Sequence, residues 1–353
     1  SKMSHMSTNK NITFPFSAII GQEEMKKGLI LNVIHPKIGG ILVFGEKGTA
    51  KSTAVRSMAG LLPEIEVVKG CRFRCNPRDV SSMCEECREK INAGETLESE
   101  LSKMKVVDLP VSATEDRVVG SLDIEEAIQN GKKKFELGVL AQANRGILYV
   151  DEINLLDDHI VDLLLDSAAM GVNTVEREGI SFSHPANFIL VGTMNPEEGE
   201  LRPQLLDRFG FSVEIKGIQD PVQRVEIVKL RGKFEEDPTA FIQSYANKEH
   251  ELAYRILQAQ KLLPKVEISD EILLINAKLS IALEVDGHRA DLIMMKAEKA
   301  MATFEGRSYV TIEDVEAVAK MVFLHRLKSL PFESSKTLDM EVIQSIIQET
   351  VHE

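Results

Sequence analysis

The sequence predicts an α/β domain with a mostly parallel sheet, followed by an all-helical domain. In the first two thirds of the chain, short apolar runs alternate with helical patterns, which is typical of a parallel sheet covered by helices. Beyond about residue 220 the β-branched runs stop, and amphipathic helical patterns follow one another. A length of 353 residues also favours two domains over one small core.

We expect three parts of the chain. Residues 1–12 would form a disordered tail, because the first six, with two methionines in a polar run, look like the remnant of an expression tag. Residues 13–220 would form the α/β core, with an insertion at residues 69–105, here called the cysteine segment, that carries all four cysteines. Residues 221–353 would form the helical domain.

The apolar patterns place the elements of both domains. The expected strands are Ile41–Phe44, Ile65–Val68, Lys105–Leu109, Ile147–Val150, Ile189–Met194 and Phe211–Ile215. The expected helices of the second domain are Pro221–Phe234, Lys248–Leu262, Asp270–Leu283, Arg289–Phe304 and Thr311–Leu330. Two helix starts are well marked, since Ser269 precedes an acidic pair and Thr311 with Asp314 fits a capping box.

Composition and charge exclude several classes of protein. The apolar fraction of 43% with 27% charged residues is that of a globular chain. A net charge of -13 argues against a nucleic-acid or acidic-membrane partner, because phosphates attract basic surfaces. The chain has neither an apolar run of about 18 residues nor the apolar core of a secretory signal. We therefore expect a cytoplasmic protein.

A glycine-rich loop predicts the nucleotide site. It lies between an expected strand and a helix over residues 53–62, and its sequence is Gly45-Glu46-Lys47-Gly48-Thr49-Ala50-Lys51-Ser52, followed by Thr53. Backbone N–H groups of such a loop bind phosphates, Lys51 reaches the β- and γ-phosphate oxygens, and the Ser52 hydroxyl binds Mg²⁺. Ala50 replaces the second glycine of the usual motif, which requires a negative φ there. A chance glycine-rich turn is the alternative.

Two carboxylates follow the strand that ends at Val150, about 100 residues after the loop. Asp151 is expected in the Mg²⁺ shell, and Glu152 would orient the attacking water or accept its proton. In isolation this pair would be a solvated strand end. The upstream phosphate loop makes the catalytic interpretation specific.

Two further polar residues follow the next expected strand. Asn195 comes directly after Met194 and could position water or contact the γ-phosphate, although an Asn before Pro196 also suits a turn. Arg208 lies in the loop before Phe211 and could act as an arginine finger on the nucleotide of a neighbouring subunit. A surface ion pair with Asp207 is the alternative for Arg208.

Longer stretches resemble the AAA+ superfamily and, within it, the ATPase subunit I family of magnesium chelatase. The resemblance covers about residues 14–330. Besides the phosphate loop, it rests on residues 16–22, 107–110, 113–123, 146–158, 173–179, 184–186, 195–208, 287–292 and 302–307. The Thr-Glu-Asp-Arg-Val stretch from Thr114 and the Glu-Arg-Glu-Gly stretch from Glu176 are far more specific than the phosphate loop.

The resemblance implies an AAA+ P-loop core with a helical lid, and roles for particular residues. Asn195 looks like sensor 1, Arg208 like the arginine finger, and Arg289 like the sensor 2 arginine of the lid. Ile19, Ile20 and Gly21 would line the adenine pocket. Residues 114–129 resemble the helix 2 insertion of the family, and residues 171–187 resemble the hairpin before sensor 1. A bland alternative for Arg289 is an ion pair with Asp286 or Asp291.

The resemblance also implies a function. The family forms ATP-driven rings, here expected to be hexameric, and works with an integrin-like-domain D subunit and a large porphyrin-binding H subunit. Together they insert Mg²⁺ into protoporphyrin IX in chlorophyll biosynthesis, so this chain would bind ATP and Mg²⁺ and hydrolyse the nucleotide. Alternatives are a cobaltochelatase-type subunit and a MoxR-like remodelling ATPase. A DNA helicase is disfavoured by the acidic charge and by a hairpin in which Arg177 stands between two glutamates.

The cysteine segment departs from the family pattern in its thiols. Cys71, Cys75, Cys84 and Cys87 lie within 17 residues, which matches the ligand count of a structural Zn²⁺ site. The basic residues Lys69, Arg72, Arg74 and Arg78 would offset part of the charge of four thiolates. A redox-active dithiol and ordinary free cysteines are the alternatives.

Overall fold

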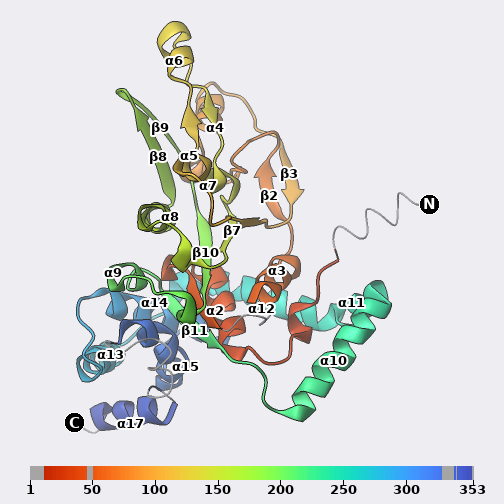
Figure 1. Ribbon diagram of the computed structural model, residues 1–353, viewed down its shortest axis with the longest axis vertical. Coiled ribbons are helices and arrows are strands. Elements are labelled where there is room, and N and C mark those ends of the chain that lie inside the picture. The colour runs from red at the N-terminus through yellow and green to blue at the C-terminus, as the bar shows by residue number, and fades with distance from the viewer. Residues whose placement is uncertain (1–11, 46–50, 328–337, 339, 352–353) are drawn as a thin grey trace. The chain divides into compact units, whose positions relative to one another are not determined.

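The computed structural model describes residues 12–45, 51–327, 338 and 340–351 of the chain (Figure 1). A five-stranded parallel sheet has the order β11-β1-β10-β7-β4. Its strands are β1 (Ile41–Gly45), β4 (Val106–Asp108), β7 (Gly146–Val150), β10 (Phe188–Met194) and β11 (Phe211–Ile215). β1, β7 and β10 are buried along their whole length, as continuous apolar strands of a covered parallel sheet should be. The predicted fold class is confirmed.

One expected strand belongs to a different sheet. β2 (Ile65–Val68) pairs antiparallel with β3 (Ser99–Ser102), and the two form a sheet of their own. The prediction that residues 65–68 join the parallel sheet was therefore wrong. Only the second half of β2 is buried, and Glu66 is bound by Arg78 and Ser99 instead. β2 and β3 thus bring together the two ends of most of the cysteine segment.

The described residues divide into two compact units. One contains those up to Leu62 together with those from Met194 onward, and the other is Pro63–Thr193. The domain boundary expected near residue 220 stays a prediction. Within the part of the chain that the structure describes, no helix is long and apolar enough to span a membrane.

The first unit consists mainly of helices. After α2 (Glu23–Ile34) and α3 (Lys51–Leu61), its chain runs through α9 (Pro203–Leu206), α10 (Pro221–Glu236), α11 (Pro238–Ser244), α12 (Ala246–Leu262), α13 (Asp270–Ala282), α14 (Arg289–Phe304), α15 (Ile312–Phe323) and α17 (Met340–Val351). Both expected helix starts are found: Ser269 accepts from Ile272 N–H, and Thr311 forms a capping box with Asp314. α11 and α17 were not predicted.

The second unit carries three two-stranded antiparallel sheets and several short helices. β8 (Val172–Arg177) and β9 (Ile180–Pro185) form the hairpin expected before Asn195, and they follow α8 (Asp158–Met170). The expected insertion contains α5 (Glu115–Val119), β5 (Ser121–Leu122) and α6 (Ile124–Asn130), followed by β6 (Phe135–Glu136) and α7 (Val139–Gln142). The cysteine segment contributes α4 (Glu85–Asn92) and β3.

Candidate nucleotide-binding site

The phosphate loop begins where β1 ends and finishes where α3 begins. Gly45 is the last residue of β1 and Lys51 the first of α3, so the strand-loop-helix order expected from the sequence is present. Lys51 Nζ donates to Gly45 O at 2.8 Å, which places the ammonium group at the strand end. Ser52 and Thr53 follow in the first turn of α3. The remaining loop residues expected to bind nucleotide, Glu46, Lys47, Gly48, Thr49 and Ala50, lie outside the described residues.

Asp151 and Glu152 follow β7 directly, and one buried hydroxyl contacts both. Thr193 Oγ1 donates to Asp151 Oδ1 at 2.5 Å and accepts from Glu152 N–H at 3.1 Å. Thr193 is 1% exposed and lies on β10, the strand next to β7. The hydroxyl therefore orients a carboxylate that is itself solvent-exposed. Thr193 was missed in the sequence, where the only sign was a polar residue inside an otherwise apolar strand.

The backbone at Glu152 has an unusual conformation. Its φ is +54°, in the left-handed region that residues other than glycine seldom adopt. Such backbone conformations cost on the order of 1–3 kcal/mol and often occur at functional sites. Here the turn starts a short 3-10 helix (Ile153–Leu155) immediately after the strand. The Glu152 side chain is thereby half-buried at the strand end.

Asn195 follows β10 and also has a structural task. Its Oδ1 accepts from Glu197 N–H at 3.1 Å and caps a short 3-10 helix, Pro196–Glu198. The turn that the Asn-Pro pair indicates is therefore present. Because the carboxamide oxygen is engaged in the cap, the NH₂ group of this 8% exposed residue is the end that can donate to a phosphate oxygen or a water.

Asp207, the residue before Arg208, is bound by two arginine side chains. Its Oδ2 accepts from Arg289 Nη1 at 2.9 Å, and its Oδ1 accepts from Arg326 Nε at 3.0 Å. Arg289 is the first residue of α14, and its partner Asp207 is distant in sequence. Asp291, one of the alternative partners considered for Arg289, instead accepts from the Ser280 hydroxyl. Arg208 is next to this carboxylate in the chain. Asp207 is thus the chain neighbour of one arginine predicted to bind phosphate, Arg208, and the ion-pair partner of the other, Arg289.

Arg326 is the buried partner in this group. Its side chain is 1% exposed, and its other donors bind the carbonyl oxygens of Asp207, Phe209, Gly210 and Val322. Burial lowers the pKa of Arg326 to about 10, so it remains charged at neutral pH. It anchors the loop that carries Arg208. The sequence contained no local sign of this role, because the contacts join residues more than 100 positions apart.

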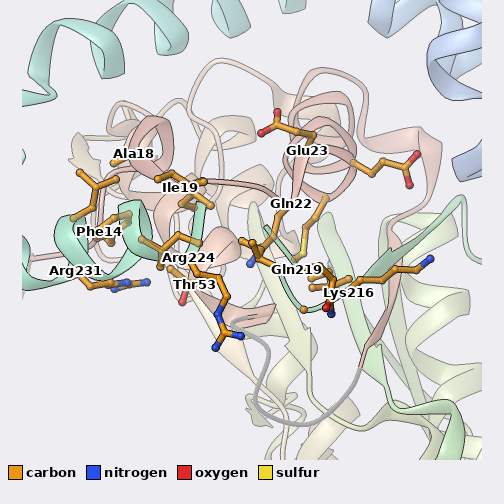
Figure 2. Close-up of a pocket in the computed structure, with 18 of the residues that line it drawn as sticks. Phe14, Ala18, Ile19, Gln22, Glu23, Thr53, Lys216, Gln219, Arg224 and Arg231 are labelled. Atoms are coloured by element: carbon orange, nitrogen blue, oxygen red, sulfur yellow. The ribbon is translucent and has the colours of Figure 1, made fainter. Parts of the chain in front are cut away.

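A cavity of about 700 Å³ lies in the first unit, a size typical of small-molecule sites. Its wall includes Ile19, Ile20 and Thr53, three residues expected at the nucleotide, as Figure 2 shows for Ile19 and Thr53. Residues from the end of β11 and from α10 complete it, among them Ile218 and Arg224. The wall also carries cations such as Arg224 and carboxylates such as Glu23 and Glu214, and its apolar part suits a purine ring.

Gly21 lies between two residues that line the same cavity, Ile20 and Gln22, but does not itself line it. Its φ is +76°, and a Cβ on it would lie 3.2 Å from Ile218 Cδ1 on the cavity wall. The preceding segment is held by Glu249, whose carboxylate accepts from the N–H groups of Phe16 and Ser17 at 3.0 and 3.1 Å. Arg231 lies over the Phe14 ring at 4.1 Å. These contacts shape the wall on which Ile19 and Ile20 lie.

Comparisons with known proteins agree with this site. Residues 121–219 match the family described as magnesium chelatase, subunit ChlI, and residues 274–346 match the AAA lid domain. The chain is 54% identical to the magnesium-chelatase subunit ChlI homolog of Methanocaldococcus jannaschii, over 95% of this chain and 91% of that protein. The chain belongs to the magnesium-chelatase subunit ChlI family. It is also 53% identical to the ChlI subunit of Guillardia theta, over 93% of each protein.

Solved structures support the fold of this ChlI family member. A cryo-EM based structure of the complex between subunits BchI and BchD of magnesium chelatase has a chain that is 47% identical, with a TM-score of 0.55. The match covers 93% of this chain and all of the other. A crystal structure from Cytophaga hutchinsonii, 17% identical with a TM-score of 0.60, shares the fold over 94% of this chain.

Proposed function

We propose that this chain is the ATP-hydrolysing motor subunit of a magnesium chelatase-type complex. The observation that carries the proposal is the carboxylate pair after β7, which a buried threonine contacts at both residues, in a chain about half identical to ChlI subunits. Similarity to ChlI over nine tenths of the chain also favours a chelatase subunit over a MoxR-like remodelling ATPase.

The residues that would bind and hydrolyse ATP have distinct tasks. Ile20, Gly21 and Thr53 would contact the nucleoside, and Lys51 would donate to the phosphate oxygens. Ser52 and Asp151 would hold Mg²⁺, which when bound neutralises negative charge on the phosphates. Glu152 would accept the proton of the attacking water, and Asn195 would donate to that water or to the γ-phosphate. The proposed ligands of Mg²⁺ are the oxygen atoms of a hydroxyl and a carboxylate, and oxygen ligands suit this hard cation.

Hydrolysis would be completed by a neighbouring copy of the chain. Arg208 would donate to the γ-phosphate bound by the next subunit, and Arg289 would donate to the nucleotide of its own. Such exchange of arginines requires a ring, which we propose is a hexamer. The BchI–BchD complex among similar structures supports a D-type subunit as a partner.

The chemical product would be formed by the whole complex. We propose that ATP hydrolysis here drives insertion of Mg²⁺ into protoporphyrin IX on a large H-type subunit in the cytoplasm, as a step of chlorophyll-type porphyrin biosynthesis. The cofactors of this activity are ATP and Mg²⁺. Zn²⁺ at the four cysteines would serve the fold of the cysteine segment and take no part in hydrolysis.

Replacing Glu152 with Gln tests the proposed hydrolysis. Removing only the proton acceptor should lower kcat for ATP by about 100-fold or more while ATP still binds. Steady-state phosphate release and equilibrium binding of a fluorescent ATP analogue measure the two quantities. The exposed Glu64→Gln is a matched control for loss of one charge. Wild-type turnover by the Glu152→Gln protein would disprove the role given to this residue.

A further inference from the structure

The four cysteines of the cysteine segment come together in space. Their Sγ atoms all lie within 4.8 Å of one another. Cys71 Sγ is 3.8 Å from Cys84 Sγ and 3.6 Å from Cys87 Sγ. These distances are far longer than the roughly 2.05 Å of a disulfide. They are close to the sulfur–sulfur edge of about 3.8 Å that four Zn–S bonds of about 2.3 Å give in a tetrahedron.

Two backbone turns supply the cysteines in pairs. Cys71 and Cys75 lie in the turn that follows β2, where Val68 N–H donates to Cys75 O and Cys71 N–H to Val68 O. Cys84 is the N-cap of α4, and Cys87 lies in the first turn of that helix. Cys84 N–H donates to Cys75 Sγ at 3.1 Å and so connects the two pairs. Each turn thus presents two sulfur atoms to one point.

Ordinary hydrophobic packing does not explain this arrangement well. Three of the four cysteines are at most 4% exposed. Cys87 is nevertheless the only buried residue among the eight of α4, so this helix buries almost no apolar surface. An isolated helix of that length is not stable in water. The stability of α4 therefore depends on the interaction that holds Cys84 and Cys87 against the turn after β2.

The arginines near the four cysteines form hydrogen bonds with groups other than the sulfur atoms. Arg72 donates to Phe135 O, and Arg78 pairs with Glu66 at 2.8 Å, so both cations are engaged away from the sulfur atoms. Arg74 binds Ser102 and Lys103 O. Lys69 lies 4.0 Å from the Glu98 carboxylate. That these four basic residues offset part of the charge of the thiolates stays a prediction. The guanidinium of Arg145 donates to the carbonyl oxygens of Glu66 and Arg74.

We propose that Cys71, Cys75, Cys84 and Cys87 bind one Zn²⁺ in a tetrahedral structural site, and that this ion fixes the base of the β8–β9 hairpin through Phe73. Binding involves no redox change: four thiols lose their protons to solvent, and four Zn–S bonds form. With four protein ligands the site is closed, which is typical of structural rather than catalytic zinc. The proposal does not depend on the ATPase function.

The link to the hairpin runs through an aromatic cluster. Phe73 lies between the first two cysteines, is 2% exposed, and stacks on His184 of β9 with ring centroids 5.0 Å apart. Phe135 and Phe182 pack on the same group, with their centroids 4.5 Å apart. Asn144 Nδ2 donates to Phe73 O at 2.6 Å and holds the turn in place. Loss of the ion would release the turn and leave His184 and Phe182 without one face of their packing.

Metal content tests the site directly. Full-length protein purified without chelator should contain close to one zinc per chain by elemental analysis, and the Cys84→Ser, Cys87→Ser double variant should contain less than a tenth of that. Glu86→Gln, a change on the same turn of α4, is the control and should keep its zinc. A metal-free preparation with four titratable thiols and a protected α4, or a disulfide found by mass spectrometry, would overturn the proposal.

Hydrogen exchange tests the link to the hairpin without relying on a variant that could fail to fold. Zinc is removed from the wild-type protein with a chelator and restored with ZnCl₂. Amides of α4 and of β8 and β9 should exchange at least 10-fold faster without zinc and recover when it is restored, whereas those of α14 should not change. Faster exchange in α4 alone would disprove the link to the hairpin. Unchanged exchange everywhere would disprove a structural role for the ion.

Discussion

The strand ends that carry the nucleotide residues and the cysteine segment are held in different ways. β1, β7 and β10 are buried along their whole length, and apart from the buried Thr193 their polar residues for catalysis follow the ends of the strands. In the cysteine segment, by contrast, the side chains that carry chemistry are the buried ones. Where apolar burial holds the backbone, the polar side chains remain available for catalysis. In the cysteine segment the reactive side chains are the cysteines, and they would themselves hold the fold. Substitutions should therefore separate activity from stability at the strand ends.

The largest effect is expected for Lys51→Ala. Losing the ammonium that would contact the phosphates should lower ATP turnover by about 1,000-fold and abolish nucleotide-dependent assembly, while the midpoint of urea unfolding stays unchanged. Phosphate release, size-exclusion chromatography with and without ATP, and urea titration measure these three properties. A large loss of stability would contradict the separation of activity from fold at the strand ends.

Arg208→Ala comes next, because it should lower turnover about as much as Lys51→Ala does but should affect activity alone. An arginine finger contributes roughly 1,000-fold or more to turnover, and its loss affects the nucleotide of a neighbour. Arg208→Ala and Glu152→Gln proteins, each inactive alone, should therefore regain part of the ATPase activity when mixed, because some interfaces then contain both intact residues. If mixed rings form and no mixture recovers activity, Arg208 is not the finger.

Glu298 offers the opposite case, a buried carboxyl that should affect stability and not turnover. Burial raises its pKa to about 8 from an ordinary 4.5, and Asn276 donates to it at 2.6 Å. The folded state binds this proton more tightly, so the stabilising contribution is complete below pH 4.5 and is lost as the pH rises through 8. The loss is on the order of 4 kcal/mol.

Urea unfolding at pH 5.5 and pH 9 checks this prediction. In Glu298→Gln the free energy of unfolding should fall much less between the two pH values than in the wild type, and ATP turnover at pH 7 should be unchanged. The exposed Glu251→Gln is the control and should keep the wild-type pH dependence. If the free energy of unfolding has the same pH dependence in the wild type and in Glu298→Gln, then Glu298 does not bind a proton more tightly in the folded state.

Most of the strand ends could be predicted from the sequence, because each depends on a local pattern of an apolar run followed by a polar residue. Such a pattern placed Asp151 and Asn195 directly after their strands, and the glycine-rich motif placed Lys51 at the start of the helix that follows β1. Local patterns could not show that β2 pairs with β3, since register and partner depend on residues more than 30 positions away. Thr193 and Arg326 were missed for the same reason: their partners are distant in sequence.

The carboxylate of Asp207 has one consequence for the roles proposed for Arg289 and Arg208. Arg289 cannot give the same N–H donor both to Asp207 and to a γ-phosphate, so nucleotide and aspartate compete for it. If Arg289 acts as sensor 2, ATP binding would weaken its ion pair with Asp207 and so alter the ionic surroundings of the next residue in the chain, Arg208. In the proposed ring, the surroundings of the finger that one subunit offers to its neighbour would then respond to the nucleotide bound by that same subunit.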